Sequence, residues 1–187
     1  RLPFTTSECP QFNNLTIPSS TMSGIHKRTV VGQVVVNKRG LAGDEQADLT
    51  VHGGLAKAVY AYPAEHYAFW QAQRKQLGGS PDLPYGSLGE NLTLSGVLEN
   101  AMFVGDELHF PNCVLRVTQP REPCFKLNAF LGDRQAAKKM VQMGFCGFYL
   151  AVDEVGTIAA GQTFTVKPSI RQVSISDFFR VATRRDR

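Results

Sequence analysis

The sequence predicts a mixed α/β fold, mainly β, in which a curled, barrel-like sheet is flanked by a few helices. Short apolar runs recur between Gly, Pro and Asn residues, while only a few segments have a helical pattern. Many strands with few helices favour a sheet that curls toward closure rather than a doubly wound nucleotide fold. The length of 187 residues suits one domain, or one domain with a small appendage.

Six segments have the composition and length of strands. They are Thr29–Val36, Ala58–Tyr62, Leu92–Leu94, Cys113–Thr118, Gly147–Val152 and Gln162–Val166. In the fourth segment, alternation with a period of two places Cys113 on the more apolar face, together with Leu115 and Val117. Cys113 is therefore expected to pack in the core.

Two helices are expected, and a third starts near Ser176. The first begins at Pro63, a residue shaped for the first helical position, and runs toward Leu77. The second runs from Asp133, which suits an N-cap, to Gly144, which suits a C-terminal stop. Its apolar stripe consists of Ala136, Ala137, Met140 and Val141.

The charge of the chain favours a small anionic ligand over a polyanion. Lys and Arg number 20 against 16 Asp and Glu, which gives a net charge of +4 and a pI near 9.0. The cations are dispersed apart from Arg184, Arg185 and Arg187, and no basic stripe with interleaved aromatic residues is present. Nucleic acid is therefore not an expected partner.

Cysteine usage and hydropathy predict a cytoplasmic protein. The four cysteines include no CxxC pair, so neither a zinc ribbon nor a thioredoxin-like site is expected. With 43% hydrophobic residues the chain can form a core without disulfides, so reduced thiols are expected. No apolar run of about 18 residues and no signal-peptide core occur, so no membrane association is expected.

The stretch VTQPREPCFKL carries the most informative chemistry. Pro120 and Pro123 restrict the backbone of a loop that follows a strand, and Cys124 lies in that loop. Arg121 and Lys126 are within three residues of the cysteine, and nearby cations favour the thiolate over the thiol. The pattern therefore favours a reactive or metal-binding Cys124 over a packing cysteine.

Two chemistries remain open for such a thiolate. A cysteine nucleophile needs a base, and the chain offers four histidines, His26, His52, His66 and His109. A soft-metal ligand needs thiolate character and a cationic pocket for the rest of the ligand. Spacing along the chain does not decide between these chemistries.

Two glycine-rich stretches, Gly40–Asp44 and His52–Gly54, match neither a P-loop nor a GxGxxG fingerprint. The simpler interpretation is that both form turns. The alternative is that the backbone amides of Gly53 and Gly54 approach a ligand phosphate.

The stretch Thr118–Leu127, TQPREPCFKL, resembles the cysteine loop of the MOSC domain family, the molybdenum cofactor sulfurase C-terminal domain, and in particular its YiiM-like subgroup. Further landmarks occur in the order typical of the family. They are Ser23–Lys27, Gly40–Asp48, Val51–Gly54, Lys57–Tyr67, Gly89–Leu92 and Gly105–Asp106. The resemblance implies an N-terminal extension at 1–22, a MOSC β-barrel domain at 23–168, and a truncated helical C-terminal region at 169–187.

The resemblance also implies a molybdenum–molybdopterin cofactor, with the thiolate of Cys124 as metal ligand and catalytic residue. The pterin phosphate requires cations or exposed amides, for which Lys27, Arg121 and Arg28 are the expected cations. By family position, the remaining expected cofactor-binding residues are Asp44, His52, Gly53, Gly54, Glu90 and Asn91. Tyr60 and Trp70 are expected in the core.

The implied activity is two-electron reduction of N-hydroxylated compounds such as 6-hydroxylaminopurine, which detoxifies modified bases. The metal supplies the redox chemistry, and the protein positions the substrate. No flavin or iron–sulfur motif is visible, so a separate reductase is expected to donate the electrons, and a homodimer is left open. The alternatives are a non-catalytic carrier of the cofactor or of sulfur on Cys124, and a metal-free cysteine enzyme.

Overall fold

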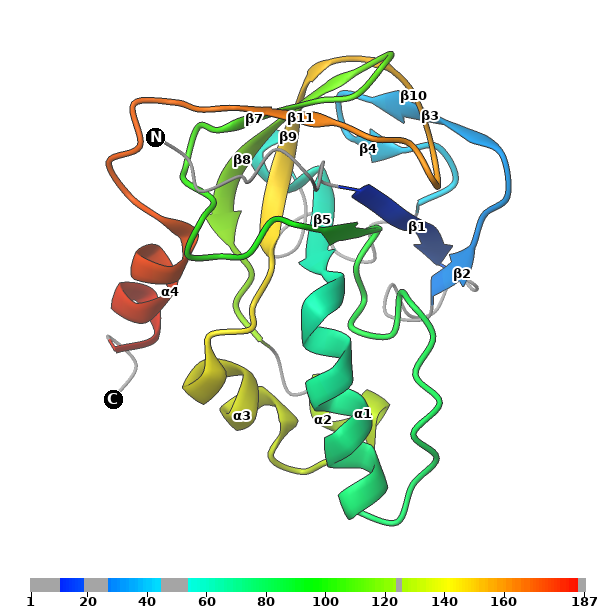
Figure 1. The fold of residues 1–187 in the computed structure, drawn as a ribbon, viewed down its shortest axis with the longest axis vertical. Coiled ribbons are helices and arrows are strands. Elements are labelled where there is room, and N and C mark those ends of the chain that lie inside the picture. Colours follow the sequence, from blue (N-terminus) through cyan, green and yellow to red (C-terminus); the bar gives the residue numbers. More distant parts are fainter. Residues whose placement is uncertain (1–10, 19–26, 45–53, 124–125, 185–187) are drawn as a thin grey trace.

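The structure, a computed structural model, describes residues 11–18, 27–44, 54–123 and 126–184 (Figure 1). The strands are β1 (Gln11–Pro18), β2 (Lys27–Thr29), β3 (Gln33–Asn37), β4 (Gly40–Leu41), β5 (Val59–Pro63), β6 (Leu92–Ser95), β7 (Glu107–His109), β8 (Val114–Pro120), β9 (Phe148–Glu154), β10 (Gly156–Ala159) and β11 (Thr165–Lys167). The α-helices are α1 (Tyr67–Gln76), α2 (Lys126–Leu131), α3 (Ala136–Met143) and α4 (Ile175–Arg184), and the 3-10 helices are η1 (Leu55–Lys57) and η2 (Ala64–His66).

The strands form one large curled sheet and one small sheet. The large sheet has eight strands in the order β11-β7-β8-β9-β5-β6-β1-β2, and the small one has the order β10-β3-β4. The pairings are antiparallel except for that between β5 and β6. Register shifts occur between β8 and β9 and between β1 and β6, and irregularities of this kind bend a sheet. The expected mixed α/β fold, mainly β and curled, is confirmed.

Several expected strands need correction. Thr29–Val36 is wrong as a single strand, because the chain breaks between β2 and β3 at Gly32, whose φ of 94° is a left-handed conformation. The expected strand at Gln162–Val166 begins later, at Thr165. Four strands were not expected, namely β1, β4, β7 and β10. Of these, β1 lies in the expected N-terminal extension, where it pairs with β2 and β6.

β5 separates two hydrophobic clusters. Its side chains alternate, so that Val59 and Ala61 join the larger cluster while Tyr60 and Tyr62 join the smaller one. The larger cluster contains Cys113, which is 2% exposed, so its expected place in the core is confirmed. The smaller cluster lies between the sheet and the helices α1, α2 and α3 and contains the buried Trp70, so the core positions expected for Tyr60 and Trp70 are also confirmed.

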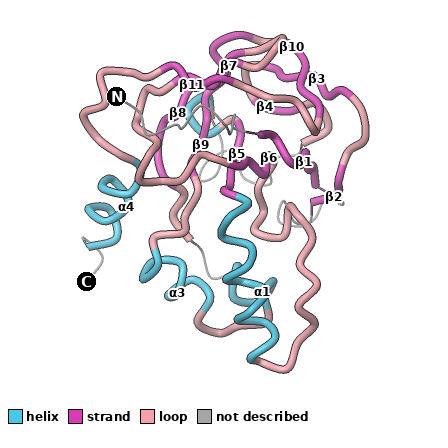
Figure 2. Tube along the Cα trace, in the orientation of Figure 1, coloured by secondary structure: helices cyan, strands magenta, loops and turns pink. Residues whose placement is uncertain are grey.

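Helices α1, α2 and α3 lie together on one side of the molecule, and α4 lies at a second place (Figures 1 and 2). Helix α1 follows Pro63, the last residue of β5, after one turn of 3-10 helix. Helix α3 ends at the expected Gly144 with φ 73°, but it begins at Ala136, three residues after the expected Asp133. Asp133 instead accepts a hydrogen bond from the Gln135 amide at 2.8 Å in the turn before the helix. Helix α4 confirms the helix expected near Ser176 and lies apart from α1, α2 and α3.

Helix α2 was not expected. It follows the cysteine loop directly and is only 6 residues long, too short for its apolar spacing to be read from the sequence. Within the ranges that the structure describes, no helix is both long enough and apolar enough to cross a lipid bilayer.

Candidate functional site

Lys27 and Asp44 form a buried ion pair at one edge of the large sheet. Lys27 begins β2 and Asp44 follows β4, and the Lys27 Nζ lies 2.7 Å from the Asp44 Oδ1. The side chains are only 5% and 6% exposed. Burial lowers the pKa of Lys27, an effect that the Asp44 and Glu90 carboxylates oppose and the Arg121 charge reinforces. Lys27, Asp44, Glu90 and Arg121 are therefore close enough to interact as one charged group.

Asn91 connects this ion pair to β5. Its amide Nδ2 donates to the Asp44 Oδ2 at 2.8 Å, and its Oδ1 accepts from the Tyr60 amide at 3.0 Å. The Asn91 amide in turn donates to the Tyr60 carbonyl at 2.8 Å. Both oxygens of Asp44 are thus engaged, one by Lys27 and one by Asn91. Asn91 thereby fixes the position of Asp44 relative to the central strand.

Glu90 is a fully buried carboxylate that holds the turn before β6. It accepts hydrogen bonds from the Tyr67 hydroxyl, the Gly86 and Leu88 amides, and the Thr93 hydroxyl. Several donors around one carboxylate offset the cost of burying its charge. Glu90 therefore places a negative charge near Lys27. Its two carboxylate oxygens accept hydrogen bonds from groups of the protein.

Arg121 brings a second buried cation to the cluster. It directly follows β8, is 9% exposed, and places its guanidinium carbon 4.9 Å from the centre of the Tyr60 ring. The Tyr60 hydroxyl donates to the Cys146 carbonyl at 2.9 Å, which fixes the ring beneath the guanidinium. Sequence reasoning assigned Tyr60 to the core and missed this role. The signal was the alternation in β5, which places Tyr60 on the face opposite Val59 and Ala61.

The structure brings together Lys27, Asp44, Glu90, Asn91 and Arg121, five of the ten predicted site residues. Three others, Cys124, His52 and Gly53, lie outside the described residues. The remaining two are Arg28, whose backbone pairs with Ile17 in β2, and Gly54, which precedes η1. Gly54 has φ 102°, and a Cβ placed there would meet no atom of the described residues within 4 Å. Its conformation is one that favours glycine.

Lys57 is a further cation near the cluster, and it was not among the predicted site residues. It ends η1, and its Nζ lies 5.8 Å from the centre of the Tyr149 ring. The Thr118 hydroxyl, on β8, lies within hydrogen-bond distance of two carbonyl oxygens, that of Ala56 at 2.5 Å and that of Tyr149 at 3.0 Å. These contacts attach η1 to the strand that leads to Arg121. The lysine of the motif Lys57–Tyr67 was the available signal.

The described cysteines and histidines do not form a reactive pair of thiol and base. Burial raises the pKa of the Cys113 thiol to about 11 and that of Cys146 well above its usual value. The His66 ring is buried, with its Nε2 2.8 Å from the Glu99 Oε2, and His109 lies near the surface beside Glu107. Both thiols are therefore packing cysteines, and His26 and His52 lie outside the described residues.

The charged cluster suits an oxygen-rich anion. An ammonium group carries three N–H donors, and within the described ranges the hydrogen bond of Lys27 goes to Asp44, so donor capacity remains. Arg121 adds a guanidinium that matches phosphate geometry. The described part of the chain contains no group of three His, Cys, Asp or Glu side chains that could hold a metal ion. These residues thus fit the phosphate of a pterin cofactor, whose metal would need further ligands.

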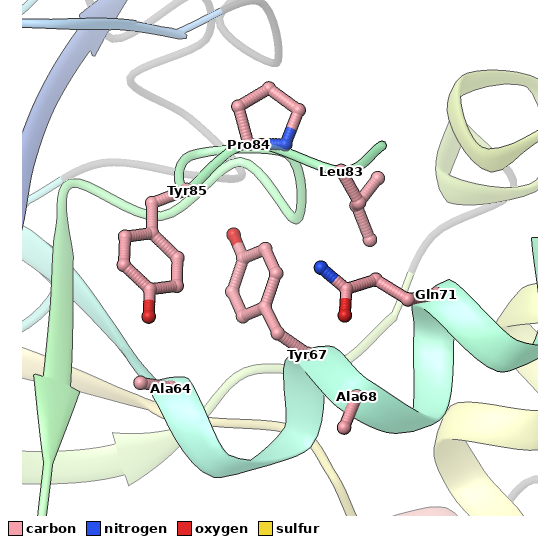
Figure 3. Close-up of a pocket in the computed structure, with 7 residues that line it drawn as sticks. All are labelled: Ala64, Tyr67, Ala68, Gln71, Leu83, Pro84 and Tyr85. Carbon is pink, nitrogen blue, oxygen red and sulfur yellow. The ribbon is translucent and has the colours of Figure 1, made fainter. Parts of the chain in front are cut away.

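A separate hollow lies between α1 and the loop before Glu90 (Figure 3). Its volume is about 380 Å³, and its lining consists of Ala64, Tyr67, Ala68, Gln71, Leu83, Pro84 and Tyr85. Figure 3 shows the Tyr67 ring between Tyr85 and Gln71. None of the lining residues carries a charge, so this hollow offers an anion no cationic partner.

The structure thus combines a curled sheet with a buried cluster of two cations and two carboxylates. Residues 48–165 match the MOSC domain, and the chain belongs to the MOSC domain family. MOSC domains are associated with binding of the molybdenum cofactor, so membership supports a molybdenum-cofactor-related function in general.

Relatives of known sequence agree with this membership. The chain is 40% identical over 139 residues to the uncharacterized protein YflK of Bacillus subtilis, and 31% identical over 165 residues to the protein YiiM of Escherichia coli. It is 34% identical over 146 residues to a protein of Gibberella moniliformis named Reductase. These matches cover 74%, 88% and 77% of the chain, and 61%, 73% and 25% of the respective relatives.

Solved structures support the fold. The crystal structure of YiiM from Geobacillus stearothermophilus matches with a TM-score of 0.76 and 27% identity, over 95% of this chain and 86% of that one. The crystal structure of Escherichia coli YiiM matches with a TM-score of 0.70 and 23% identity, over 92% of this chain and 77% of that one. The resemblance to YiiM-like MOSC proteins is therefore confirmed.

Proposed function

We propose that the protein binds the molybdenum cofactor and reduces N-hydroxylated compounds, with 6-hydroxylaminopurine as a representative substrate. The observation that carries the proposal is the buried cluster of Lys27, Asp44, Asn91 and Arg121, of which Arg121 lies three residues before Cys124 in the chain. Family membership supplies the cofactor class, and the relative named Reductase favours redox chemistry over simple transport.

In this proposal each residue of the cluster has a defined task. Lys27 and Arg121 bind the cofactor phosphate, while Asp44 and Asn91 hold the ammonium of Lys27 in place. Tyr60 supports the guanidinium of Arg121. Cys124 supplies one thiolate to the metal, and the neighbouring Arg121 and Lys126 favour its ionised form.

The reaction consumes two electrons and two protons. The substrate R–NHOH gives R–NH₂ and water as the N–O bond breaks, so 6-hydroxylaminopurine yields adenine. The bound cofactor supplies the electron transfer to the substrate. The chain itself holds the cofactor and excludes water around Lys27 and Arg121, whose side chains are buried. The electrons come from a separate donor protein.

Metal analysis tests the ligand assignment directly. Wild-type protein and the Cys124→Ser variant would be expressed in cells with intact cofactor biosynthesis, and molybdenum would be measured per folded protein. We expect loss of most of the molybdenum from Cys124→Ser. The matched control is Cys113→Ala, which removes a buried thiol of the core and should keep the metal. Full molybdenum in Cys124→Ser would contradict the assignment.

Turnover distinguishes an enzyme from a carrier. Metal-loaded protein would be mixed with 6-hydroxylaminopurine and excess dithionite, and adenine would be followed by chromatography. We expect adenine in proportion to the dithionite electron pairs consumed, and none with Cys124→Ser. Metal-loaded protein that forms no adenine would favour the alternative function, a carrier of the cofactor or of sulfur on Cys124.

A further inference from the structure

The three helices α1, α2 and α3 form a strongly basic lobe. Residues 67–77 and 126–143, here called the helical lobe, contain six cations and one acid and therefore have a net charge of +5. Since the whole chain has a net charge of +4, all other residues together sum to −1. The cations are Arg74, Lys75, Lys126, Arg134, Lys138 and Lys139. The excess charge of this protein is thus concentrated on one structural unit.

The single acid of the helical lobe is not available at the surface. Asp133 is buried, and its carboxylate accepts from the Lys139 Nζ at 2.7 Å and from the Gln135 amide at 2.8 Å. The adjoining segments 78–83 and 121–123 add two acids, Asp82 and Glu122, and one cation, Arg121, which leaves a net charge of +4. The exposed charge of the lobe is therefore positive.

The helical lobe is a firm surface. Lys139 on α3 also donates to the Gln73 Oε1 on α1 at 2.6 Å. Beneath the helices, Trp70, Leu127, Leu131 and Met140 pack in one buried cluster with the tyrosines of the sheet. Lys75, Lys126, Arg134 and Lys138 are exposed on the outside. Figures 1 and 2 show the three helices together on one side of the molecule, away from the small sheet.

Part of the helical lobe directly follows the proposed metal ligand, Cys124, in the chain. Helix α2 begins at Lys126, two residues after Cys124, and two residues of chain span at most about 7 Å. The part of the lobe at the start of α2 is therefore within about 7 Å of the proposed metal ligand along the chain. Electron transfer weakens steeply with distance, so a donor must dock near the metal.

We propose that the helical lobe is the docking surface for the acidic electron-carrier protein that re-reduces the cofactor, an inference that rests on the proposed function. Small flavin or iron–sulfur carriers deliver one electron at a time, so two reduced carriers and two protons convert R–NHOH to R–NH₂ and water. Two exposed apolar side chains, Leu77 and Met143, belong to the same lobe and suit a small transient interface.

The aromatic residues of the helical lobe distinguish this partner from nucleic acid. Tyr67 and Trp70 are buried, and Phe69 and Phe130 are half-buried, so no aromatic side chain of the lobe is fully open for base stacking. Opposite charges mainly accelerate encounter and orient the partner, which is what a transient electron donor requires. The charge and the lack of stacking surface together favour an acidic protein.

Charge reversal with a matched control tests the proposal. The lobe variant is Lys75→Glu, Arg134→Glu and Lys138→Glu combined. The control is Arg39→Glu, Lys167→Glu and Arg184→Glu combined, which changes the net charge by the same amount at exposed positions outside the lobe. The probe is an acidic flavodoxin in its fully reduced form, and the readout is its oxidation rate with metal-loaded protein and 6-hydroxylaminopurine. Dithionite replaces flavodoxin in a parallel assay.

We expect the lobe variant to lower the flavodoxin rate by about 10- to 100-fold at low salt, and the control to lower it by less than about threefold. Raising the salt from about 20 to about 300 mM should slow the wild type and remove most of the difference. The dithionite rate should be unchanged in both variants. Equal loss in the two variants, or no loss in either, would overturn the docking surface, whereas a wild type inactive with dithionite would overturn the proposed function itself.

Discussion

At the scale of single residues, the site depends on the hydrogen-bond and ion-pair partners of its buried charged groups. Asp44 uses both carboxylate oxygens within the protein, and Glu90 is surrounded by donors of its own turn. Lys27 and Arg121 are buried cations of the same cluster. Because the anions are engaged internally and an ammonium offers more than one donor, the cluster favours binding of an anion over binding of a cation.

The lowered pKa of Lys27 gives a pH dependence to anion binding. A phosphate monoester such as methyl phosphate stays dianionic above pH 8, because its second pKa is about 6. Its affinity should fall as Lys27 loses its proton, at a pH below the 10.5 of a free lysine, and approach a tenfold loss per pH unit beyond the pKa. Titration calorimetry from pH 7 to pH 10 measures this fall.

Two substitutions of Lys27 serve as references for that titration. Lys27→Arg keeps its charge over the whole range and should give a flat profile, because a guanidinium has a pKa above about 12. Lys27→Met should bind roughly 10- to 100-fold more weakly at pH 7 and show little pH dependence. The other charged groups of the cluster are Asp44, Glu90 and Arg121. A wild-type affinity that stays constant to pH 10 would contradict the assignment of Lys27.

The contribution of Lys27 to folding stability should rise with pH, whereas the affinity for an anion should fall. The pKa of Lys27 is lower in the folded chain than in the unfolded one, so between these two values the unfolded state binds more protons. The contribution of Lys27 to the free energy of unfolding therefore rises with pH in that window below 10.5. Burial, the largest cause of the shift, penalises only the charged form.

The sequence predicted which residues belong to this cluster, but it did not predict how they contact one another. Lys27, Asp44, Asn91 and Arg121 were identified from motif positions, and the structure places them together. Their contacts with a cofactor stay a prediction. The alternation in β5 indicates the face on which Tyr60 lies but not its contact with Arg121, because that contact depends on sheet order: β9 inserts between β8 and β5, and local patterns do not encode this.

At the scale of elements, the link between α3 and β9 is held tightly from the sheet. The Tyr62 and Tyr60 hydroxyls donate to the Phe145 and Cys146 carbonyls at 3.2 and 2.9 Å. The Gly147 amide donates to the Glu99 Oε1 at 2.8 Å. The same glutamate faces His66, so one carboxylate connects η2, the loop before β7 and the start of β9. This link therefore sets where β9 enters the sheet.

Alanine substitutions at Gly147 and at Gly144, as its control, test how tightly this link is packed. Both have positive φ, 62° and 73°, so alanine is strained at either position. At Gly144 a Cβ meets nothing within 4 Å, and Gly144→Ala should cost about 1 kcal/mol. At Gly147 a Cβ would lie 2.4 Å from the Ala61 carbonyl oxygen, so Gly147→Ala should cost about 3 kcal/mol or more. Urea unfolding compares them, and equal losses would refute the packing argument.

The elements that sequence reasoning missed share simple physical causes. β4 and β7 have only 2 and 3 residues, too few for a period to appear. β1 carries two adjacent asparagines at a register shift, which breaks the apolar alternation. Helix α2 was hidden by the prolines before it, which indicated a loop. The longer strands β5, β8 and β9 were predicted because their burial leaves a continuous apolar pattern.

At the scale of the whole molecule, Asp106 fastens the segment that leads to α4 onto the sheet. This fully buried carboxylate accepts from the Phe103 and Ser169 amides at 3.1 and 2.8 Å and from the Arg171 guanidinium at 2.9 Å. The guanidinium also lies 5.0 Å from the centre of the Phe103 ring. The family landmark Gly105–Asp106 therefore has a structural explanation within the described part of the chain.

Replacing Asp106 should loosen this connection. Asp106→Asn keeps the size of the side chain but removes the charge that Arg171 faces, and we expect a loss of about 2 to 4 kcal/mol in the free energy of unfolding. Asp177→Asn, at an exposed ion pair on α4, should cost less than about 1 kcal/mol. Urea unfolding gives both values, and faster proteolysis near residues 169–175 should accompany the first. Similar losses for both variants would show that Asp106 is not the fastening residue.

The order of the strands has a consequence for biosynthesis. Arg121 meets Tyr60 only after β9, residues 148–154, has inserted between their two strands. Until β9 has been synthesised, the contact between Arg121 and Tyr60 is therefore not formed, whereas the contacts of Lys27, Asp44 and Asn91 do not involve β9. A ligand that needs Lys27 and Arg121 held together would therefore bind only after β9 has been synthesised.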